Sequence, residues 1–436
     1  MGTALFTGVT GLQAHQRKLD VIAANISNVN TYGYRGSRVL FQDLFAQTLR
    51  GGSPPVGNFG GLNPMQVSLG VRVGAIDTNF NQGSMVTTGV PSDFAIQGTG
   101  FFVLSDGSQQ FFTRDGSFSL NANGLLIDPS TGFRVQGYRA NEDGVIPDDA
   151  VPEDIFIPIG GQSIVRATTT AKIVGTLNAD APPGTTVTRS VVVYDSLGTA
   201  RNITLEFTRA ATPTNTWTWD ATYNRGTAEA PDIVSVAQGA QPLTFQGNGS
   251  LAANDPAAIG TVSITAADLG LPPSQPADPF EFTLDFSELT HLSGGLDSVT
   301  GEPLPREVTL LNQDGYPRGE LESFALGGNG QIIGVFSNGL NRVIAQIALG
   351  SFANVGGLIR VGDNLFSATP ASGPAIIGAP ETGGRGTVSG GVLENSNVDL
   401  GTEFSNLIIA QRGFQANART ITAADTVLQE AVNLVR

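Results

Sequence analysis

Apolar residues recur at seven-residue intervals near both ends of the chain. One ladder consists of Leu393, Leu400, Leu407, Phe414, Ile421, Leu428 and Val435, and the other of Leu5, Leu12, Leu19 and Ile26. A repeat of seven places these side chains along one face of an α-helix, and such a seam is completed by packing against another helix. The pattern predicts a terminal helical domain made of residues 1–30 together with 393–436.

The second row of each predicted seam is interrupted. It reads Phe404, Gln411, Ala418, Asp425 and Val432 in the later ladder, and Gly8, His15, Ile22 and Val29 in the earlier one. A weak second row suits packing among several helices better than a tight two-stranded coil. We therefore expect a multi-helix layer. The alternative is that both stretches are amphipathic helices that cover a core within one chain.

Residues 31–72 form a connecting segment between the first helix and the strands. The helical pattern stops at Asn28, Asn30, Thr31 and Gly33, which favour turns. A later run is rich in glycine, with Gly51, Gly52, Gly57, Gly60 and Gly61. We predict an extended arm without a core of its own, and we expect these five glycines to act as hinges.

From Val73 onward the pattern changes to strands and turns. Three pairs, Asp106-Gly107, Asp115-Gly116 and Asn123-Gly124, follow short strands rich in phenylalanine. Such pairs tolerate the positive φ of tight hairpins, so we predict a β-meander with the phenylalanines buried. Residues 73–158, joined by 316–392, then form a middle β domain.

Residues 159–315 form a second β domain, inserted into the middle one. Trp217, Trp219, Ala221 and Tyr223 alternate with polar residues, as in a strand with one buried and one solvated face. The predicted fold is therefore mainly β with α-helical termini, in a nested multidomain arrangement. Paired N- and C-terminal helices form an inner layer, and two antiparallel β domains lie outside it.

Composition narrows the function further. The net charge is −15, from 23 Lys and Arg against 38 Asp and Glu, so nucleic acid and anionic membranes are poor candidate partners. No apolar run approaches the roughly 20 residues of a membrane span. We also find no stretch with the pattern of a cleaved secretory signal.

Catalytic chemistry finds little support in the sequence. There is no cysteine, and the two histidines, His15 and His291, show neither catalytic nor metal-ligand spacing. His15 falls on the seam of the first helix, which favours a structural role. We predict no catalytic, cofactor-binding or metal-binding residues, and hence a protein that is not an enzyme.

Two motifs resemble the bacterial flagellar rod and hook family. The stretch from Ala24 to Arg35 is similar to the N-terminal signature of that family, and two stretches, 396–400 and 411–417, are similar to its C-terminal signature. The motif residues are Asn25, Asn28, Thr31, Gly33, Tyr34, Ser396, Asn397, Val398, Asp399, Gln411, Arg412 and Asn417. In physical terms, we expect the asparagines near residue 28 to satisfy helix-end groups, and Asn397 and Asp399 to cap the second helix.

The resemblance implies an axial tube protein without a cofactor, whose terminal helices pack with neighbouring copies around a channel. The inserted domain, including Val193 to Gly198, is similar to the outer domain of hook proteins. This favours a hook subunit that polymerises into a curved helical tube and carries torque as a universal joint. The implied partners are further copies, the distal rod, hook cap and hook–filament junction proteins, and the flagellar type III export apparatus. The implied location is the extracellular hook of the flagellum.

Two alternatives remain open at this point. A distal rod protein would share both ends, and the arm from Arg38 to Gly70 resembles such proteins more than many hook proteins. This departure leads to the hypothesis that the arm adds contacts between subunits and tunes the bending stiffness of the tube. A β-rich adhesin or glycan-binding module would explain Trp217 and Trp219 but not the helical ladders.

Overall fold

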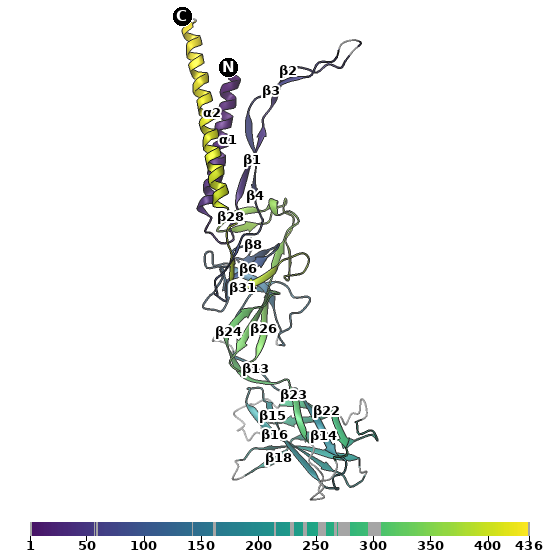
Figure 1. Ribbon diagram of the computed structural model, residues 1–436. Helices are drawn as coiled ribbons and strands as arrows, with labels where there is room; N and C mark the ends of the chain where they lie inside the picture. The colour runs from purple at the N-terminus through teal and green to yellow at the C-terminus, as the bar shows by residue number, and fades with distance from the viewer. Residues whose placement is uncertain are drawn as a thin grey trace. The chain divides into compact units, whose positions relative to one another are not determined.

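The computed structural model describes residues 2–55, 57, 60–141, 143–159, 163–212, 215–226, 231–238, 242–251, 259–265, 268, 280–294 and 307–434 (Figure 1). The chain divides into two compact units. Unit 1 comprises Met1–Pro158, Ser323–Val335 and Asn341–Arg436, and unit 2 comprises Ile159–Glu322 and Phe336–Leu340. Mainly β structure with a helix near each end confirms the predicted fold class.

Two helices of unit 1 pack against each other along their length. Helix α1 spans Gly2–Ser27 and α2 spans Leu400–Leu434. They run antiparallel, so the two termini lie at the same end of the pair (Figure 1). The prediction that the terminal helices lie together is therefore confirmed. Neither helix, over its described residues, is long and apolar enough to span a membrane.

The expected start of the second helix at Leu393 is wrong. Leu393 lies in strand β32 (Val392–Glu394), which pairs with β5 (Met85–Thr87). Its side chain is buried in the β domain, and the chain then turns before α2 begins at Leu400. Leu393 is buried in a strand and Leu400 is exposed at the start of α2, so the spacing of seven between them does not mark one helical seam. Val435 lies outside the described residues.

The arm is a two-stranded antiparallel ribbon. Strand β1 (Ser37–Asp43) pairs with β4 (Val71–Thr78), and β2 (Ala46–Arg50) pairs with β3 (Met65–Ser68). The near half packs against α1, where Thr10 Oγ1 would lie 2.3 Å from a Cβ placed on Gly70. Since β4 continues to Thr78, the ribbon extends beyond the expected end of the arm at Arg72.

The β structure of unit 1 is built from segments on both sides of the insertion. Its sheet runs in the order β25-β26-β11-β7-β8-β29-β28, with short strands at its margins. A separate pair joins β6 (Phe94–Gln97) to β31 (Thr387–Gly390). The bounds are β7 Phe101–Ser105, β8 Gln110–Thr113, β9 Ser119–Leu120, β10 Leu126–Ile127, β11 Arg134–Arg139, β12 Glu153–Asp154, β25 Gln331–Phe336, β26 Asn341–Ile347, β27 Leu349–Ser351, a 3₁₀ turn Val355–Gly357, β28 Ile359–Gly362, β29 Leu365–Ser367 and β30 Ile376–Gly378.

The first turn of the predicted meander, at Asp106-Gly107, is confirmed. At the second, Asp115-Gly116, the structure differs from the prediction. Strands β7 and β8 form a hairpin around Gly107, which has φ +98°. After Asp115-Gly116 the chain does not pair back, because β8 pairs with β29 instead. Gly116 is needed for space, since a Cβ there would lie 1.7 Å from Phe94 O. Phe101, Phe102, Phe112 and Phe118 are buried, as predicted.

Unit 2 packs two sheets around one hydrophobic core. One sheet has the order β19-β21-β22-β14-β23, and the other has β15-β16-β17-β18 with β20 beside β17. Strands β14 and β22 are parallel, which departs from the predicted all-antiparallel pairing. Trp217 and Trp219 are buried in the core. The bounds are β13 Ser163–Arg166, β14 Thr170–Asn178, β15 Thr186–Tyr194, β16 Ala200–Arg209, β17 Thr216–Asn224, β18 Ile233–Ser235, β19 Ala237–Gln238, β20 Leu243–Thr244, β21 Ile259–Ile264, β22 Phe280–Leu292, β23 Val308–Gln313 and β24 Tyr316–Leu326, the last of which passes from unit 2 into unit 1.

Candidate functional site: the helix pair and its junction with the β domain

Helices α1 and α2 approach closely through glycines. A Cβ placed on Gly8 would lie 2.9 Å from Ile421 Cγ1, and one on Gly11 would lie 2.5 Å from Asn417 Oδ1. Because only hydrogen occupies these positions, the larger side chain on α2 fills the space above each glycine. The closest approach of the two helices is therefore at Gly8 and Gly11 of α1, which meet the ladder residue Ile421 and Asn417 on α2.

The ladder residues are covered to different degrees. Most are half-buried, and this group consists of Leu5, Leu12, Leu19, Ile26, Leu407, Phe414, Ile421 and Leu428. Ile22 is buried, whereas Leu400 is exposed. The contact within one chain thus leaves much of the ladder surface incompletely covered.

Other apolar side chains of the pair point to solvent. Ile409 has 59% of its surface exposed, and the group as a whole consists of Phe6, Val9, Leu400, Phe404, Ile408, Ile409, Val427 and Val432. Exposed apolar side chains mark an interaction site where they gather, and Leu400, Phe404 and Ile408 recur at four-residue spacing on one face of α2. The helix pair therefore offers an uncovered face to a further partner.

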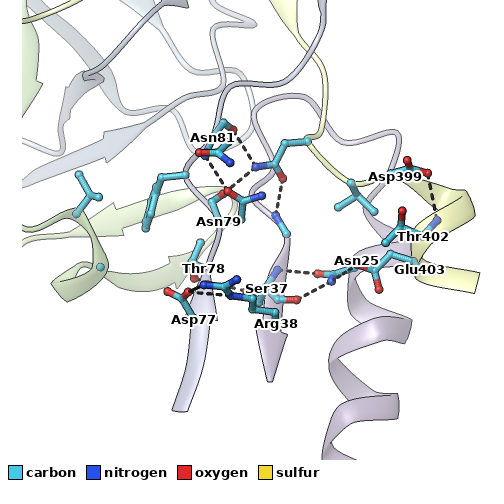
Figure 2. Close-up of a pocket in the computed structure, with 16 residues that line it drawn as sticks. Asn25, Ser37, Arg38, Asp77, Thr78, Asn79, Asn81, Asp399, Thr402 and Glu403 are labelled. Carbon is cyan, nitrogen blue, oxygen red and sulfur yellow. Dashed lines mark hydrogen bonds and ion pairs between the residues drawn. The ribbon is translucent and has the colours of Figure 1, made fainter. Parts of the chain in front are cut away.

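Asn25, at the end of α1, connects that helix to the ribbon (Figure 2). Its Nδ2 donates to Ser37 O at 2.7 Å, and its Oδ1 accepts a hydrogen bond from Ser37 N at 3.0 Å. Nδ2 also lies 3.2 Å from Glu403 Oε1 on α2. Asn25 is almost fully buried, so one side chain joins α1, β1 and α2 where water is excluded.

Asn397 makes a second set of links at the same junction. Its Oδ1 accepts from Gly36 N at 2.8 Å, while its Nδ2 donates to Asn79 O at 2.7 Å and to Asn81 O at 2.9 Å. The expectation that Asn397 caps α2 is therefore wrong, because all three bonds go to the segments flanking the ribbon. The segment before α2 is held to the segment after α1 by this residue.

The other motif residues satisfy local backbone groups. Asp399 Oδ1 accepts from Gly401 N at 2.7 Å, which confirms it as the N-cap of α2. Asn28 Nδ2 donates to Ala24 O at 2.8 Å at the end of α1, and Thr31 Oγ1 donates to Asn28 Oδ1 at 3.3 Å. These bonds explain why polar residues gather where each helix meets the β domain.

Three further motif positions shape the junction. Gly33 has φ +67°, and a Cβ there would lie 2.5 Å from Asp115 N. Tyr34 lies under the Arg360 guanidinium, with the ring centroid 5.0 Å from Cζ. Val398 packs over Gly36, and Ser396 Oγ accepts from Val398 N at 3.3 Å. Gln411 and Arg412 are exposed on α2, away from the junction.

A buried charged cluster lies beneath the junction. Glu394 Oε1 lies 2.8 Å from Arg35 Nη2, and its Oε2 lies 3.2 Å from Arg114 Nε. Arg114 also donates to Gly98 O and Gly100 O, both at 2.7 Å. Burial lowers the pKa of Arg114 to about 10, although the Glu394 carboxylate opposes this shift.

The sequence analysis missed Glu394 and assigned no role to Arg35. The only signal was their position, since Arg35 ends one motif and Glu394 lies just before the other. A buried cluster of this kind needs its remaining hydrogen bonds satisfied. Asn81 O accepts one from Arg35 Nη1, and Gly83 N donates one to Glu394 Oε1. The cluster is a structural clamp between the two terminal segments.

The junction borders a polar hollow of about 640 Å³, lined in part by Asn25, Asp77 and Glu403 (Figure 2). Burial raises the pKa of Glu403, partly offset by the hydrogen bond from Asn25. Within the described residues, no group of three or more histidine, aspartate or glutamate side chains is arranged to hold a metal ion. The groups of the hollow are used for hydrogen bonding between segments.

The five glycines of the arm lie at the tip of the ribbon. The bridge between Ser53 and Leu62 closes this tip, and a Cβ on Gly51, Gly57 or Gly60 would meet nothing within 4 Å. These glycines do not lie between the helices and the β domain. They therefore cannot form a hinge at that connection. Any role in bending must come through what the ribbon tip contacts.

Family models match successive stretches of the chain. They are described as flagella basal body rod protein (residues 5–35), flagellar hook protein FlgE/F/G D1 domain (95–167), flagellar basal body protein FlaE D2 domain (165–316) and flagellar basal body rod FlgEFG protein C-terminal (389–434). The two motifs of the sequence analysis fall in the first and last of these stretches.

Curated relatives match over the whole chain. The flagellar hook protein FlgE of Treponema pallidum is 37% identical over 467 aligned residues, covering 100% of both chains. That of Borreliella burgdorferi is 36% identical over 455 residues with the same coverage, and that of Escherichia coli is 34% identical over 445 residues, covering 99% of this chain and 100% of the relative. The crystal structure of Helicobacter pylori flagellar hook protein FlgE2 covers 70% of this chain, with a TM-score of 0.47 and 16% identity. The chain belongs to the flagellar hook protein FlgE family.

Proposed function

We propose that the chain polymerises through its paired terminal helices into a curved tube that carries torque from the rod to the filament. Membership of the family makes it a structural subunit of the flagellar hook. The observation that carries the proposed mechanism is the apolar surface left exposed on α1 and α2, including Phe6, Phe404 and Ile409. Covering that surface with further copies gives the driving force for assembly.

The contact must be heterologous to build a tube. One flank of the α1–α2 pair would pack against a different flank of the next copy, and a rotation that does not close generates an open helix. Bending during rotation then requires neighbouring copies to slide without deforming their cores. The buried cores of units 1 and 2 support domains that move as whole bodies.

The junction at Asn25 and Asn397 suits a part that transmits load. Each side chain links segments far apart in the sequence, and the Arg35–Glu394 pair joins the same segments below them. A densely bonded base would carry force from the helices to the β domain with little internal motion.

The outer half of the ribbon supports the proposal that the arm adds contacts between subunits. Phe45 has 77% of its surface exposed, and Leu49, Leu62, Met65 and Val67 are also exposed. An isolated two-stranded ribbon is at most marginally stable in water, so a partner surface would have to hold it. Deleting residues 51–61 should then loosen the tube and change its curvature, which electron microscopy measures; unchanged tubes would refute a role for the arm.

The resemblance to the family also suggests which other flagellar proteins bind the tube. The distal rod, the hook cap and the hook–filament junction proteins would bind the ends of the tube, and the flagellar type III apparatus would export the chain to the outside. Co-purification of the tagged full chain with rod and cap proteins from cells arrested during hook assembly tests this part.

The central experiment compares the full chain with a version lacking residues 2–27 and 400–434, by electron microscopy under polymerising conditions. This deletion keeps β32, which belongs to the β domain. Curved tubes from the full chain alone support the proposal. Tubes from the shortened chain would refute the helices as the assembly core.

A matched pair of single substitutions sharpens the test. Ile409→Asp places a charge on an exposed apolar position of α2, whereas Gln415→Asp does so on an exposed polar position of the same helix. We expect the first to abolish tubes and the second to leave them intact. Equal behaviour of both would contradict packing through the apolar flank.

A further inference from the structure

His15 lies where three elements meet. Its ring is edge-on to Phe41 of β1, with centroids 5.4 Å apart and planes at 80°. On the other side it packs over Gly413 of α2, where a Cβ would lie only 2.4 Å from Cε1. The imidazole on α1 therefore fills a space that the glycine leaves open, and it contacts both the second helix and the ribbon.

The ring is better suited to the neutral form than to the charged form. His15 Nδ1 is buried and has no hydrogen-bond partner among the described residues. In neutral imidazole this nitrogen can be the bare acceptor, whereas in the imidazolium it must donate. A buried donor without an acceptor costs free energy, so protonation would disfavour the closed arrangement.

The charges around His15 also oppose protonation. Lys18, on the same helix, acts on it directly, and the Lys18 ammonium lies 5.9 Å from the Phe41 ring centroid. Arg17 lies 3.9 Å from Asp20 in an exposed pair. The contact residue on α2, Gly413, is uncharged.

The ribbon also carries a positive charge beside α1. Arg72 of β4 helps line a groove with Gln13, Ala14 and Arg17 of α1, and it donates to Gln42 Oε1 at 3.3 Å. Farther along α2, Glu403 lies at the other end of the contact, where it binds Asn25. Lys18 is the charged group that shifts the pKa of His15, and among the described residues no carboxylate acts beside it there.

We propose that His15 is a pH-sensitive latch that holds α1, α2 and the ribbon together while neutral and releases them on protonation. The proposal rests on the proposed function, because it makes assembly through the helix pair weaker in mild acid. The switch consists of a proton binding to His15 Nδ1, and no other reactant is required.

The direction of the effect follows from proton linkage. Burial first, and the charge of Lys18 second, lower the pKa of His15 below 6.5 in the folded chain. The unfolded chain then binds the proton more readily, so the stabilisation is complete above pH 6.5 and is lost as the pH falls toward the lower pKa of the folded state. Each subunit of a tube would lose this stabilisation together with its neighbours.

The test is the critical concentration for tube formation, measured by sedimentation between about pH 8 and pH 5. His15→Gln keeps a polar side chain that does not titrate. The matched control is His291→Gln in unit 2, because burial first and the charge of Arg209 second also lower the pKa of His291, which stacks on Phe245 at 5.2 Å. We expect the critical concentration to rise severalfold from pH 8 to pH 5 for the unaltered chain and for H291Q. For H15Q the critical concentration should rise much less.

Lys18→Gln provides a second variant that keeps the histidine. Removing this charge should bring the pKa of His15 closer to its ordinary value and shrink the acid effect. Imidazole NMR of the full chain gives one signal for each of the two histidines and reads the two pKa values directly.

The outcomes separate the latch from the proposed function. Tubes that form at high pH, with the same acid sensitivity in H15Q and the unaltered chain, overturn the latch alone. Absence of tubes from the unaltered chain at high pH overturns the proposed function, and an NMR pKa of His15 at 6.5 or above then overturns the latch as well. If H15Q itself does not assemble, the K18Q variant and the NMR titration decide.

Discussion

Arg35 and Glu394 form a buried ion pair at 2.8 Å although 359 positions separate them in the sequence. Arg114 approaches the other carboxylate oxygen, so two guanidinium groups share one carboxylate. The pair joins the segment after α1 to the strand before α2, and so it fixes where both helices leave the β domain. Its energetic value can be measured by removing the carboxylate charge.

Glu394→Gln should lower the free energy of unfolding of unit 1 by about 3–5 kcal/mol, because two buried arginines lose their common counter-charge. Hydrogen exchange in β5 and β32 measures this change. Both tryptophans lie in unit 2, so their fluorescence should be unaffected and serves as an internal control. Asp77→Asn removes an exposed pair with Arg38 in the same unit and should cost less than about 1 kcal/mol. Equal effects of the two substitutions would refute the clamp.

Gly33→Ala should destabilise the junction for two reasons that a control separates. The residue has φ +67°, and a Cβ would lie 2.5 Å from Asp115 N. Gly132 has φ +74° but nothing within 4 Å, so Gly132→Ala carries only the conformational cost of about 1–2 kcal/mol. We expect the thermal midpoint of unit 1 to fall clearly further for G33A. Matching midpoints would mean that the backbone at residue 115 moves freely.

The regular parts of this fold were predictable from the sequence. The helices, the strands rich in phenylalanine and the glycine turn at Gly107 follow from local periodicity and backbone preference, which act within a few residues. The start of α2 could not be predicted from the sequence, because Leu393 has the apolar character that both a helix seam and a buried strand require. Periodicity does not state which partner covers a side chain.

At the junction, contacts within a few residues could likewise be predicted from the sequence, whereas contacts between distant segments could not. Asp399 was predictable as a cap, since an N-cap bonds within its own turn. Asn397 bonds instead to Gly36, Asn79 and Asn81, and those partners are set by the tertiary fold. Glu394 escaped notice for the same reason: a lone carboxylate gives no sign in the sequence of the two arginines that meet it.

Gly11→Ala tests the close approach of the helices, because helix propensity and the packing of α1 against α2 predict opposite effects of this substitution. Alanine stabilises an isolated helix by about 1 kcal/mol relative to glycine, so propensity alone predicts better assembly. A Cβ there would lie 2.5 Å from Asn417 Oδ1, so we expect a higher critical concentration for tube formation instead. The double variant G11A/N417A frees the space and should recover part of the loss. Improved assembly by G11A alone would show that the helices do not pack as described.

Asp314→Asn should destabilise unit 2 at neutral pH and have a diminishing effect in acid. Asp314 Oδ1 accepts from Thr169 N at 2.8 Å and Thr170 N at 2.9 Å, and Thr169 Oγ1 donates to Oδ2. Burial opposes ionisation of this carboxyl, but the hydrogen bonds outweigh it and lower its pKa below 3.8. A lowered pKa in the folded state gives stability that is complete above pH 3.8 and is lost as the pH falls toward the folded value.

The neutral side chain should therefore cost about 1–3 kcal/mol near pH 7, as expected for hydrogen bonds to a charged group. Tryptophan fluorescence during denaturation reports on unit 2, because Trp217 and Trp219 lie in its core. Glu288→Gln removes the partner of Lys172 at an exposed site and should change stability little at either pH. A penalty for D314N that persists unchanged in acid would mean that shape, and not the charge on Asp314, holds the turn at Thr169.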